Sequence, residues 1–187
     1  MKKRCAWVNE DPLYIQYHDC EWGVPIYDER LLFEFLILEG MQAGLSWLTV
    51  LKKRENYSNS FDHFAAEMIA NYDANKFHEL MANPGIIRNK LKIQAVITNA
   101  NAFLKIKREL GDFSGYIWSF VNGKPIKNHW QSISQVPAKT IISDAMSNDL
   151  KQRGFKFVGS TICYAFMQAT GMVNDHTVNC FCHTFPK

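Results

Sequence analysis

The sequence predicts an all-α fold from two kinds of pattern. Apolar residues recur at helical spacing in several segments, and glycine or proline residues stand at the ends of many of them. No segment shows the alternation of apolar and polar residues that is typical of a half-buried strand. A chain of 187 residues is also long enough to bury a sizeable core without disulfides.

Helical patterns begin in the N-terminal half. The first predicted helix follows Asp28, a residue type that caps helix N-termini, and ends at Gly40. The next helix contains Trp47 and three leucines at intervals of three residues (Leu45, Leu48, Leu51). Further helices are expected over residues 64–71, 74–82, 89–110, 113 to near 123, 144–152 and 160–170. The polar stretch 122–138 is the only long loop expected.

No change in composition marks a clean domain boundary. We therefore expect one domain over residues 1–187, built from two lobes. Residues of about 60–145 would form an inserted helical lobe. Residues 1–59 and 146–187 would form the other lobe, which contains the candidate metal ligands and a candidate hairpin.

Composition excludes several classes of protein. No segment approaches the roughly 20 apolar residues of a membrane span, and the basic start MKKRCAWV has no apolar secretory core. We therefore expect a cytoplasmic protein with no membrane partner. The net charge of +3 permits nucleic-acid binding without indicating it.

The five cysteines do not suggest a disulfide framework, because their number is odd and the expected compartment is reducing. Cys163 lies in an apolar run and is expected to be an inert buried thiol. The remaining four lie near the two ends of the chain.

A candidate metal site combines these ends. Cys5 and His18 lie near the N-terminus, and His176 and Cys180 lie four residues apart near the C-terminus, a spacing that would place them on one helix face. Two thiolates and two imidazoles suit tetrahedral zinc, and four protein ligands leave no open position for chemistry. The site would be structural and would tie the chain ends together.

Other interpretations of these residues stay open at this point. Cys20, Cys182 and His183 lie close enough in sequence to replace one of the four ligands. Cys5 would otherwise be a surface thiol, and His176 a buried histidine whose hydrogen bonds are satisfied beside Asp175.

A hairpin with a glycine at each end is predicted at residues 154–159. Gly154 and Gly159 flank Lys156, and the helix expected from residue 160 would present free N–H groups, so the segment suits a backbone phosphate. The apolar residues between the glycines would otherwise be ordinary core. A second glycine turn at residues 84–92 carries basic side chains, which suit phosphates or simply form a solvated face.

The N-terminal third is rich in aromatic residues around one acid. Its members are Trp7, Tyr14, Tyr17, Trp22, Glu39 and Trp47. Aromatic faces and a carboxylate would bind a cationic ligand such as an alkylated adenine better than its neutral counterpart. The alternative is that Glu39 faces solvent at the end of its helix.

Several stretches together resemble one family nearly from end to end. They are DPLYIxYH from residue 11, EWGVP from residue 21, LEGxQAGLSW from residue 38, GIIR from residue 85, RGFKFVG from residue 153 and NDH from residue 174. The chain thus resembles the bacterial 3-methyladenine DNA glycosylase I family, of the helix-hairpin-helix glycosylase superfamily.

The resemblance implies an enzyme that flips 3-methyladenine out of alkylated double-stranded DNA and hydrolyses its N-glycosidic bond, leaving an abasic site. It implies a monofunctional glycosylase with one structural Zn²⁺ on Cys5, His18, His176 and Cys180. Glu39 would hydrogen-bond the adenine edge and act as the catalytic residue through its charge. No protein partner is indicated.

The resemblance also assigns roles to the aromatic and loop residues. Tyr17 and Trp47 would stack on the base with help from Tyr14, and Trp7 and Trp22 would line the pocket. The loop formed by Gln42, Ala43, Gly44 and Leu45 would fill the gap left by the flipped nucleotide. The hairpin, through Gly154, Lys156 and Gly159, would grip backbone phosphates.

One departure concerns an acidic residue. Many members of the wider superfamily have a catalytic Asp shortly after the hairpin helix, whereas here Asp175 precedes the zinc ligand His176 and is expected to support it.

A non-catalytic zinc-stabilised module that binds alkylated DNA is the alternative function. A zinc hydrolase or deaminase is a second alternative, which the sequence disfavours because such enzymes need an open metal position and usually have H-x-E and P-C-x-x-C motifs, which are absent.

Overall fold

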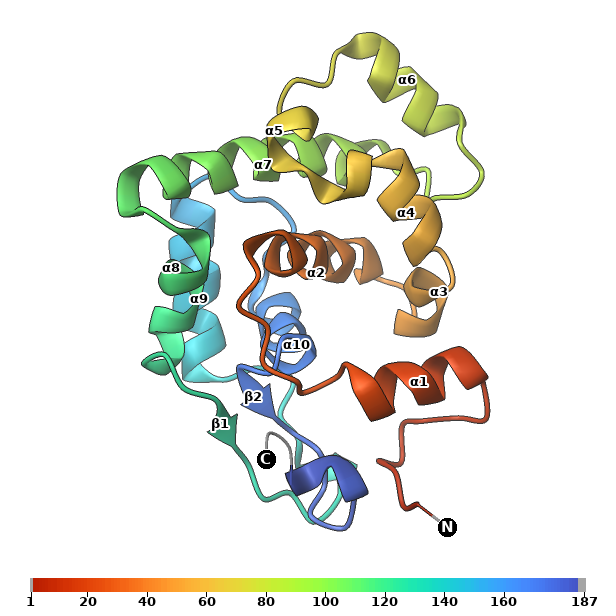
Figure 1. The fold of residues 1–187 in the computed structure, drawn as a ribbon, viewed down its shortest axis with the longest axis vertical. Helices are drawn as coiled ribbons and strands as arrows, with labels where there is room; N and C mark the ends of the chain where they lie inside the picture. The colour runs from red at the N-terminus through yellow and green to blue at the C-terminus, as the bar shows by residue number, and fades with distance from the viewer. Residues whose placement is uncertain (1, 185–187) are drawn as a thin grey trace.

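The computed structural model describes residues 2–184, most of which lie in helices (Figure 1). The α-helices of this range are α1 (Pro12–Cys20), α2 (Glu29–Gln42), α3 (Trp47–Leu51), α4 (Arg54–Ser60), α5 (Ala66–Ile69), α6 (Ala74–Ala82), α7 (Lys90–Leu110), α8 (Phe113–Trp118), α9 (Ile141–Gln152) and α10 (Ser160–Ala169). Short 3-10 turns lie at Asp62–Phe64, Ser119–Val121, Ile133–Gln135 and Phe181–Thr184. The predicted helical class is confirmed.

Helix α2 runs through the middle of the fold, between α7 and α10 (Figure 1). Asp28 caps it as predicted, by accepting a hydrogen bond from the N–H of Leu31. Its second half, from Phe35 to Met41, is buried on every side, because other elements cover it all round. The helix that carries Glu39 is therefore held by packing along its whole circumference.

The predicted end of α2 at Gly40 is wrong. The helix continues to Gln42, and Gly40 lies inside it because the hairpin packs closely there. A Cβ atom at Gly40 would lie 3.3 Å from Cβ of Phe157, so the position needs a small residue for contact rather than for a turn.

Other helices also differ from the predictions. Helix α1, capped by Asp11, was not expected, and Leu45 lies before α3 rather than within it. Helix α9 begins before Asp144, because Thr140 and Ser143 form a reciprocal capping box. The helix expected over 64–71 shortens to α5, since residues 62–64 have positive φ angles.

Two very short strands contradict the expectation of no strand. Strand β1 (Ile126–Lys127) pairs in parallel with β2 (Val173–Asn174), with Ile126 opposite Val173. Each strand has two residues, which is too short to show alternation in the sequence. The pair fastens the start of the long loop to the C-terminal segment.

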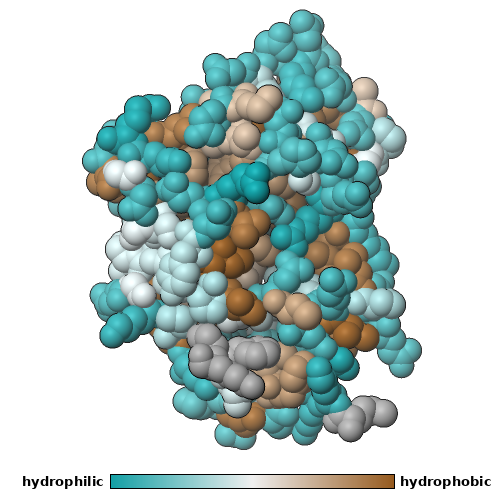
Figure 2. Space-filling view, in the orientation of Figure 1, coloured by the Kyte–Doolittle hydropathy of each residue, from teal (hydrophilic) through white to brown (hydrophobic). Residues whose placement is uncertain are grey.

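The described residues contain no helix that is long and apolar enough to cross a membrane. Figure 2 shows hydrophilic residues over most of one face, with hydrophobic residues in separate patches. The division into two lobes stays a prediction.

Gly171 provides a test of the packing around the C-terminal end of α10. A Cβ atom there would lie 2.3 Å from backbone atoms of Val24 and Pro25, and φ is +69°. Gly123 has a similar φ of +71° but no neighbouring atom within 4 Å. We expect Gly171→Ala to lower the free energy of unfolding by more than about 3 kcal/mol, and the matched Gly123→Ala by about 1 kcal/mol. Urea unfolding measures both, and equal losses would contradict the proposed backbone clash.

Candidate active site

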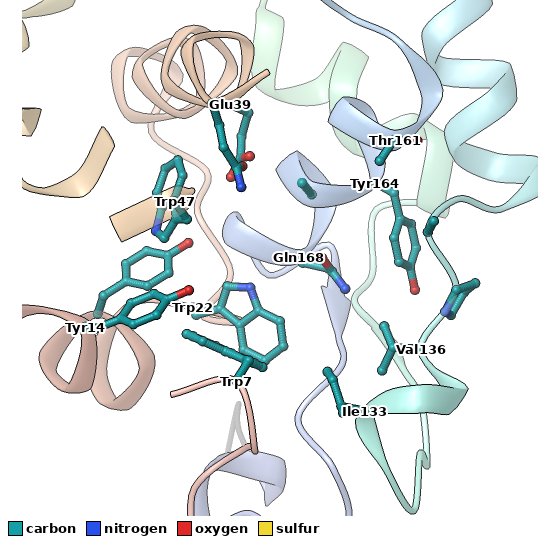
Figure 3. A pocket seen from close by; sticks show the side chains of 15 residues that line it. Trp7, Tyr14, Trp22, Glu39, Trp47, Ile133, Val136, Thr161, Tyr164 and Gln168 are labelled. Carbon is teal, nitrogen blue, oxygen red and sulfur yellow. The ribbon is translucent and has the colours of Figure 1, made fainter. Parts of the chain in front are cut away.

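One pocket of about 380 Å³ contains all six residues of the predicted aromatic and acidic group. Helices α1, α2 and α3 supply one side of it, and α10 and the loop around Val136 supply the other (Figure 3). The lining residues are Trp7, Tyr14, Tyr17, Trp22, Glu39, Gln42, Trp47, Ile133, Val136, Pro137, Ala138, Thr161, Tyr164, Ala165 and Gln168.

The aromatic rings on the first side pack against one another. The ring of Trp7 lies 4.9 Å from that of Tyr14 and 5.0 Å from that of Trp22, and Tyr17 lies 5.3 Å from Trp47, centroid to centroid. Mutual contact of this kind fixes each ring before any ligand arrives. The pocket thus presents flat, preformed faces on which an aromatic ligand can stack.

Glu39 reaches into this pocket from α2 and is only 4% exposed (Figure 3). The alternative that it faces solvent is therefore wrong. Its Oε2 atom has no hydrogen-bond partner among the described residues, and burial raises the pKa of the carboxyl group to about 8. An unpaired buried carboxyl group is costly, and a ligand that donates a hydrogen bond or carries positive charge would remove that cost.

The pocket also contains neutral hydrogen-bond donors, namely indole N–H groups and a tyrosine hydroxyl. The indole nitrogens of Trp7 and Trp47 are buried without a hydrogen-bond partner among the residues that the structure describes. Burial and the nearby Glu39 raise the pKa of Tyr17, so its hydroxyl stays protonated. The side of the pocket around Glu39 therefore offers neutral donors next to one acidic group.

The opposite wall depends on Asp175, which was expected from the sequence to support the metal site. That expectation is wrong, because its carboxylate accepts four hydrogen bonds from elsewhere. Oδ1 accepts from Asn128 and Trp130 at 2.7 Å each, and Oδ2 accepts from Tyr164 at 2.6 Å and Gln168 at 2.7 Å. Asp175 thus holds the long loop and α10 together behind the pocket.

The four predicted metal ligands meet in one buried group. Their ligand atoms all lie within 4.8 Å of one another. Nδ1 of His176 is 3.5 Å from both Cys5 Sγ and Cys180 Sγ, and Nε2 of His18 is 3.5 Å from Cys180 Sγ. Ligand atoms of a tetrahedral zinc ion lie about 3.3–3.8 Å apart, given bonds of about 2.0–2.3 Å. The donor set and its spacing therefore fit a metal ion.

The predicted helix under His176 and Cys180 is wrong, because these residues follow β2 in a loop and a turn. The N–H of Cys180 donates to the carbonyl of Thr177, and this turn brings the two side chains together. Among the other candidates, Cys20 is exposed and His183 contacts the carbonyl of Asn128. Cys182 lies beside the group, with His18 and Asp19.

Both histidine rings are held through their second nitrogen. Nδ1 of His18 donates to Asp19 at 2.8 Å, and Nε2 of His176 donates to the carbonyl of Trp22 at 2.9 Å. These bonds leave the other nitrogen of each ring as an acceptor, which is the form that binds a metal. The ring of His176 also lies 4.6 Å from that of Trp22, so the cluster directly supports a pocket residue.

The two thiols of the cluster have opposed proton affinities. Contact with Cys180 and burial raise the pKa of Cys5, whereas contact with Cys5 lowers the pKa of Cys180. A divalent cation would allow both to be thiolates in a buried place.

The two segments predicted to contact DNA lie next to the pocket and at the start of α10. Gln42 lines the pocket, Gly44 has a φ of +78°, and the side chain of Leu45 is 42% exposed. In the hairpin, Lys156 is exposed, and Gly159 precedes α10 with no side-chain cap from residues 2–184, so the first N–H groups of that helix could bind a ligand.

Comparison with known proteins agrees with this geometry. The family model for methyladenine glycosylase matches residues 7–183. This chain belongs to the methyladenine glycosylase family. It is 52% identical over 181 residues to DNA-3-methyladenine glycosylase 1 of Escherichia coli, covering 97% of each chain.

Solved structures of family members have the same fold. A crystal structure of 3-methyladenine DNA glycosylase I superposes with a TM-score of 0.95 at 54% identity, covering 97% of this chain and 100% of the other. A tyrosine-to-phenylalanine variant of a 3-methyladenine DNA glycosylase I, in complex with 3-methyladenine, superposes with a TM-score of 0.94 at 39% identity and covers 98% of each chain.

The second wall of the pocket in this family member was not predicted from the sequence. Thr161, Tyr164, Ala165 and Gln168 recur at helical spacing on one face of α10, so their shared direction was open to prediction. The loop residues Ile133 and Val136 gave no such signal, because the position of their loop depends on distant hydrogen bonds to Asp175.

The raised pKa of Glu39 predicts how stability depends on pH. Between the ordinary pKa of 4.5 and about 8, the folded chain keeps a proton on Glu39 that the unfolded chain has lost. The contribution of Glu39 to the free energy of unfolding therefore has its full value below pH 4.5 and decreases as the pH rises from 4.5 to about 8. At pH 8 the free energy of unfolding of Glu39→Gln should therefore exceed that of the wild type by about 2–4 kcal/mol, and its melting temperature should be higher. At pH 5 the two melting temperatures should be nearly the same. Thermal unfolding at both values tests this, and a pH-independent difference would contradict it.

Proposed function

We propose that this chain is a DNA-3-methyladenine glycosylase of base excision repair, which hydrolyses the N-glycosidic bond of 3-methyladenine in alkylated DNA. The observation that carries the proposal is the buried carboxyl group of Glu39 inside a pocket of aromatic faces, with no hydrogen-bond partner for its Oε2 atom in the part of the chain that the structure describes. The names of the family relatives, and the bound 3-methyladenine in one of their structures, support the same substrate.

The pocket would select a methylated base by charge. Methylation gives adenine in DNA a positive charge, and a cation in this pocket would gain from aromatic faces and an ionised carboxylate. In the free protein, burial keeps Glu39 largely protonated near neutral pH, so the cationic base would displace that proton. Normal adenine brings no charge to offset the burial of the carboxylate.

The remaining pocket residues would hold the base in place. Tyr17 and Trp47 stack on it, with the hydroxyl of Tyr14 at its edge. Trp7 and Trp22 close the pocket from the side of the metal cluster, where they contact one another. The unpaired indole nitrogens of Trp7 and Trp47 are two further donors for acceptor atoms of the ligand.

Access to the base requires the nucleotide to leave the duplex, because the target atoms are covered in stacked DNA. The loop Gln42–Leu45 would enter the gap, since its exposed Leu45 can stack where the base was. The hairpin Gly154–Gly159 would bind phosphates through Lys156 and the free N–H groups that begin α10.

Bond cleavage then needs little acid catalysis, because the methylated base is a good leaving group. Glu39 is the only carboxylate among the residues described as lining the pocket. Its charge would favour the cationic base on binding, and would stabilise the positive charge that passes to the sugar as the base leaves neutral. Water completes the reaction at the sugar carbon, and the products are free 3-methyladenine and an abasic site.

The proposal is tested by release of free base from methylated duplex under single-turnover conditions. The wild type should release 3-methyladenine, and Glu39→Gln should do so about a hundredfold more slowly, because it keeps the shape but loses the charge. Chromatography of the released base gives the rates. If the wild type binds alkylated duplex and releases no base, the chain is a binding module instead of an enzyme.

The cluster of two cysteines and two histidines would hold one structural Zn²⁺, which would supply a cross-link between the two ends of the chain. Four protein ligands would fill its coordination, so the reaction would take place away from it. Residues 5 and 18 would then be fastened to residues 176 and 180, and the Trp22 carbonyl bond to His176 would pass the restraint to the pocket.

Metal removal should therefore lower the stability of the fold rather than act directly on the reaction. Chelation, or Cys180→Ser, should lower the melting temperature through a loss of several kcal/mol of folding free energy, a part of the roughly 10–16 kcal/mol with which structural zinc binds. Cys20→Ser is the matched control, because Cys20 is exposed and lies outside the cluster. Metal analysis with thermal unfolding measures both effects, and an unchanged melting temperature in metal-free protein would refute the structural role.

A further inference from the structure

Two buried polar side chains of α7 make hydrogen bonds outside their own helix. Lys92 is 6% exposed, and its Nζ donates to the carbonyls of Met41 and Ala43 at 2.8 and 2.7 Å. Asn99 is 3% exposed, and it accepts from the N–H of Lys156 at 2.7 Å and donates to the carbonyl of Lys156 at 3.0 Å. Residues 92 and 99 are two helical turns apart and share one face of α7.

The partners of these side chains belong to the two segments that are assigned to DNA. The carbonyls of Met41 and Ala43 lie where α2 ends and the loop Gln42–Leu45 begins. Lys156 lies in the middle of the hairpin Gly154–Gly159. One helix therefore holds both segments through specific hydrogen bonds, rather than only through apolar contact.

Burying the ammonium group of Lys92 costs free energy that packing alone would not require. Burial lowers the pKa of the ammonium group, and an apolar side chain of similar length would fill the space without that penalty. A donor is needed because the last carbonyls of a helix have no partner within it, and an ammonium group suits the negative end of the helix dipole.

The hairpin shows a related restraint. Phe157, next to Lys156, has a φ of +55°, which is strained for a residue other than glycine. Such conformations persist where surrounding contacts fix them. The cavity left among α2, α7 and the hairpin is about 10 Å³, room for about one water molecule, so the three elements are closely packed.

We propose that Lys92 and Asn99 are positioning residues, which hold the loop Gln42–Leu45 and the hairpin Gly154–Gly159 at a fixed separation for one DNA strand. The loop then enters the duplex at a set distance from the phosphates that the hairpin binds. This inference rests on the proposed function, because the two segments are assigned to DNA there. Lys92 thereby acts on DNA without touching it.

The experiment compares Lys92→Met, Asn99→Ala and the double variant with matched controls on the same helix. Lys105→Met removes an exposed lysine that pairs with Glu109, and Asn101→Ala removes an exposed asparagine whose side chain donates to the carbonyl of Ile97 within α7. Two affinities are measured for each protein, one for free 3-methyladenine and one for a duplex that contains an abasic-site analogue. Hydrogen exchange at the amides of the loop and the hairpin is followed without DNA.

Each single variant should weaken binding of the duplex about tenfold or more, on the scale of a lost buried hydrogen bond, and both controls less than about twofold. Affinity for free 3-methyladenine should change less than about twofold, because Glu39 and the aromatic residues of the pocket lie outside the two segments and Gln42 alone among the lining residues described belongs to them. The double variant should lose little more duplex affinity than the single variant that binds the duplex less tightly, as expected when both contacts maintain the same arrangement. Hydrogen exchange should become faster in the loop or the hairpin.

Three results would overturn the proposal. They are duplex binding indistinguishable from that of the wild type, a parallel loss of free-base and duplex affinity, and additive losses in the double variant. If Lys92→Met does not fold, Lys92→Gln, which keeps a neutral amide donor group, takes its place in the same comparison. Failure of the proposed function is distinct, because the wild type would then bind the duplex and release no base.

Discussion

The pocket depends on one buried carboxyl group, that of Glu39, whose Oε2 atom has no hydrogen-bond partner among the described residues. Glu39 sits on the most enclosed stretch of α2, and one of its oxygens makes no hydrogen bond among the described residues. The protein tolerates this because α7, α10 and the aromatic group cover α2 on all sides. The same arrangement leaves an attraction for positive charge that the protein itself does not satisfy.

The two ends of the chain support this carboxyl group from one side. Trp22 belongs to both the pocket and the surroundings of the Cys/His cluster, since its ring lines the pocket and its carbonyl accepts from His176. Trp7 follows closely after Cys5 and contacts Trp22. The local stability of the chain ends and the shape of the pocket are therefore coupled, although the cluster lies apart from the reacting atoms.

Local pattern was enough to predict most helices, the four clustered Cys and His residues and one side of the pocket, because helical spacing, caps and residue type are properties of neighbours in sequence. The errors arose where distant residues decide. Gly40 was misread because a glycine that ends a helix and one that admits a neighbour look alike, and the difference depends on Phe157. Asp175 was assigned by its neighbour in sequence, whereas its partners come from the long loop and α10. Sequence spacing also predicted that His176 and Cys180 meet, but the contact is made across a turn and not along a helix.

The carboxylate of Asp175 has a consequence for how a substrate enters. Its four hydrogen bonds fix the long loop to α10, so the pocket wall opposite Glu39 is preorganised. A rigid recess cannot adapt to a stacked nucleotide. The conformational work of recognition therefore falls on the nucleic acid, and damaged sites where stacking is already weak would be captured most readily.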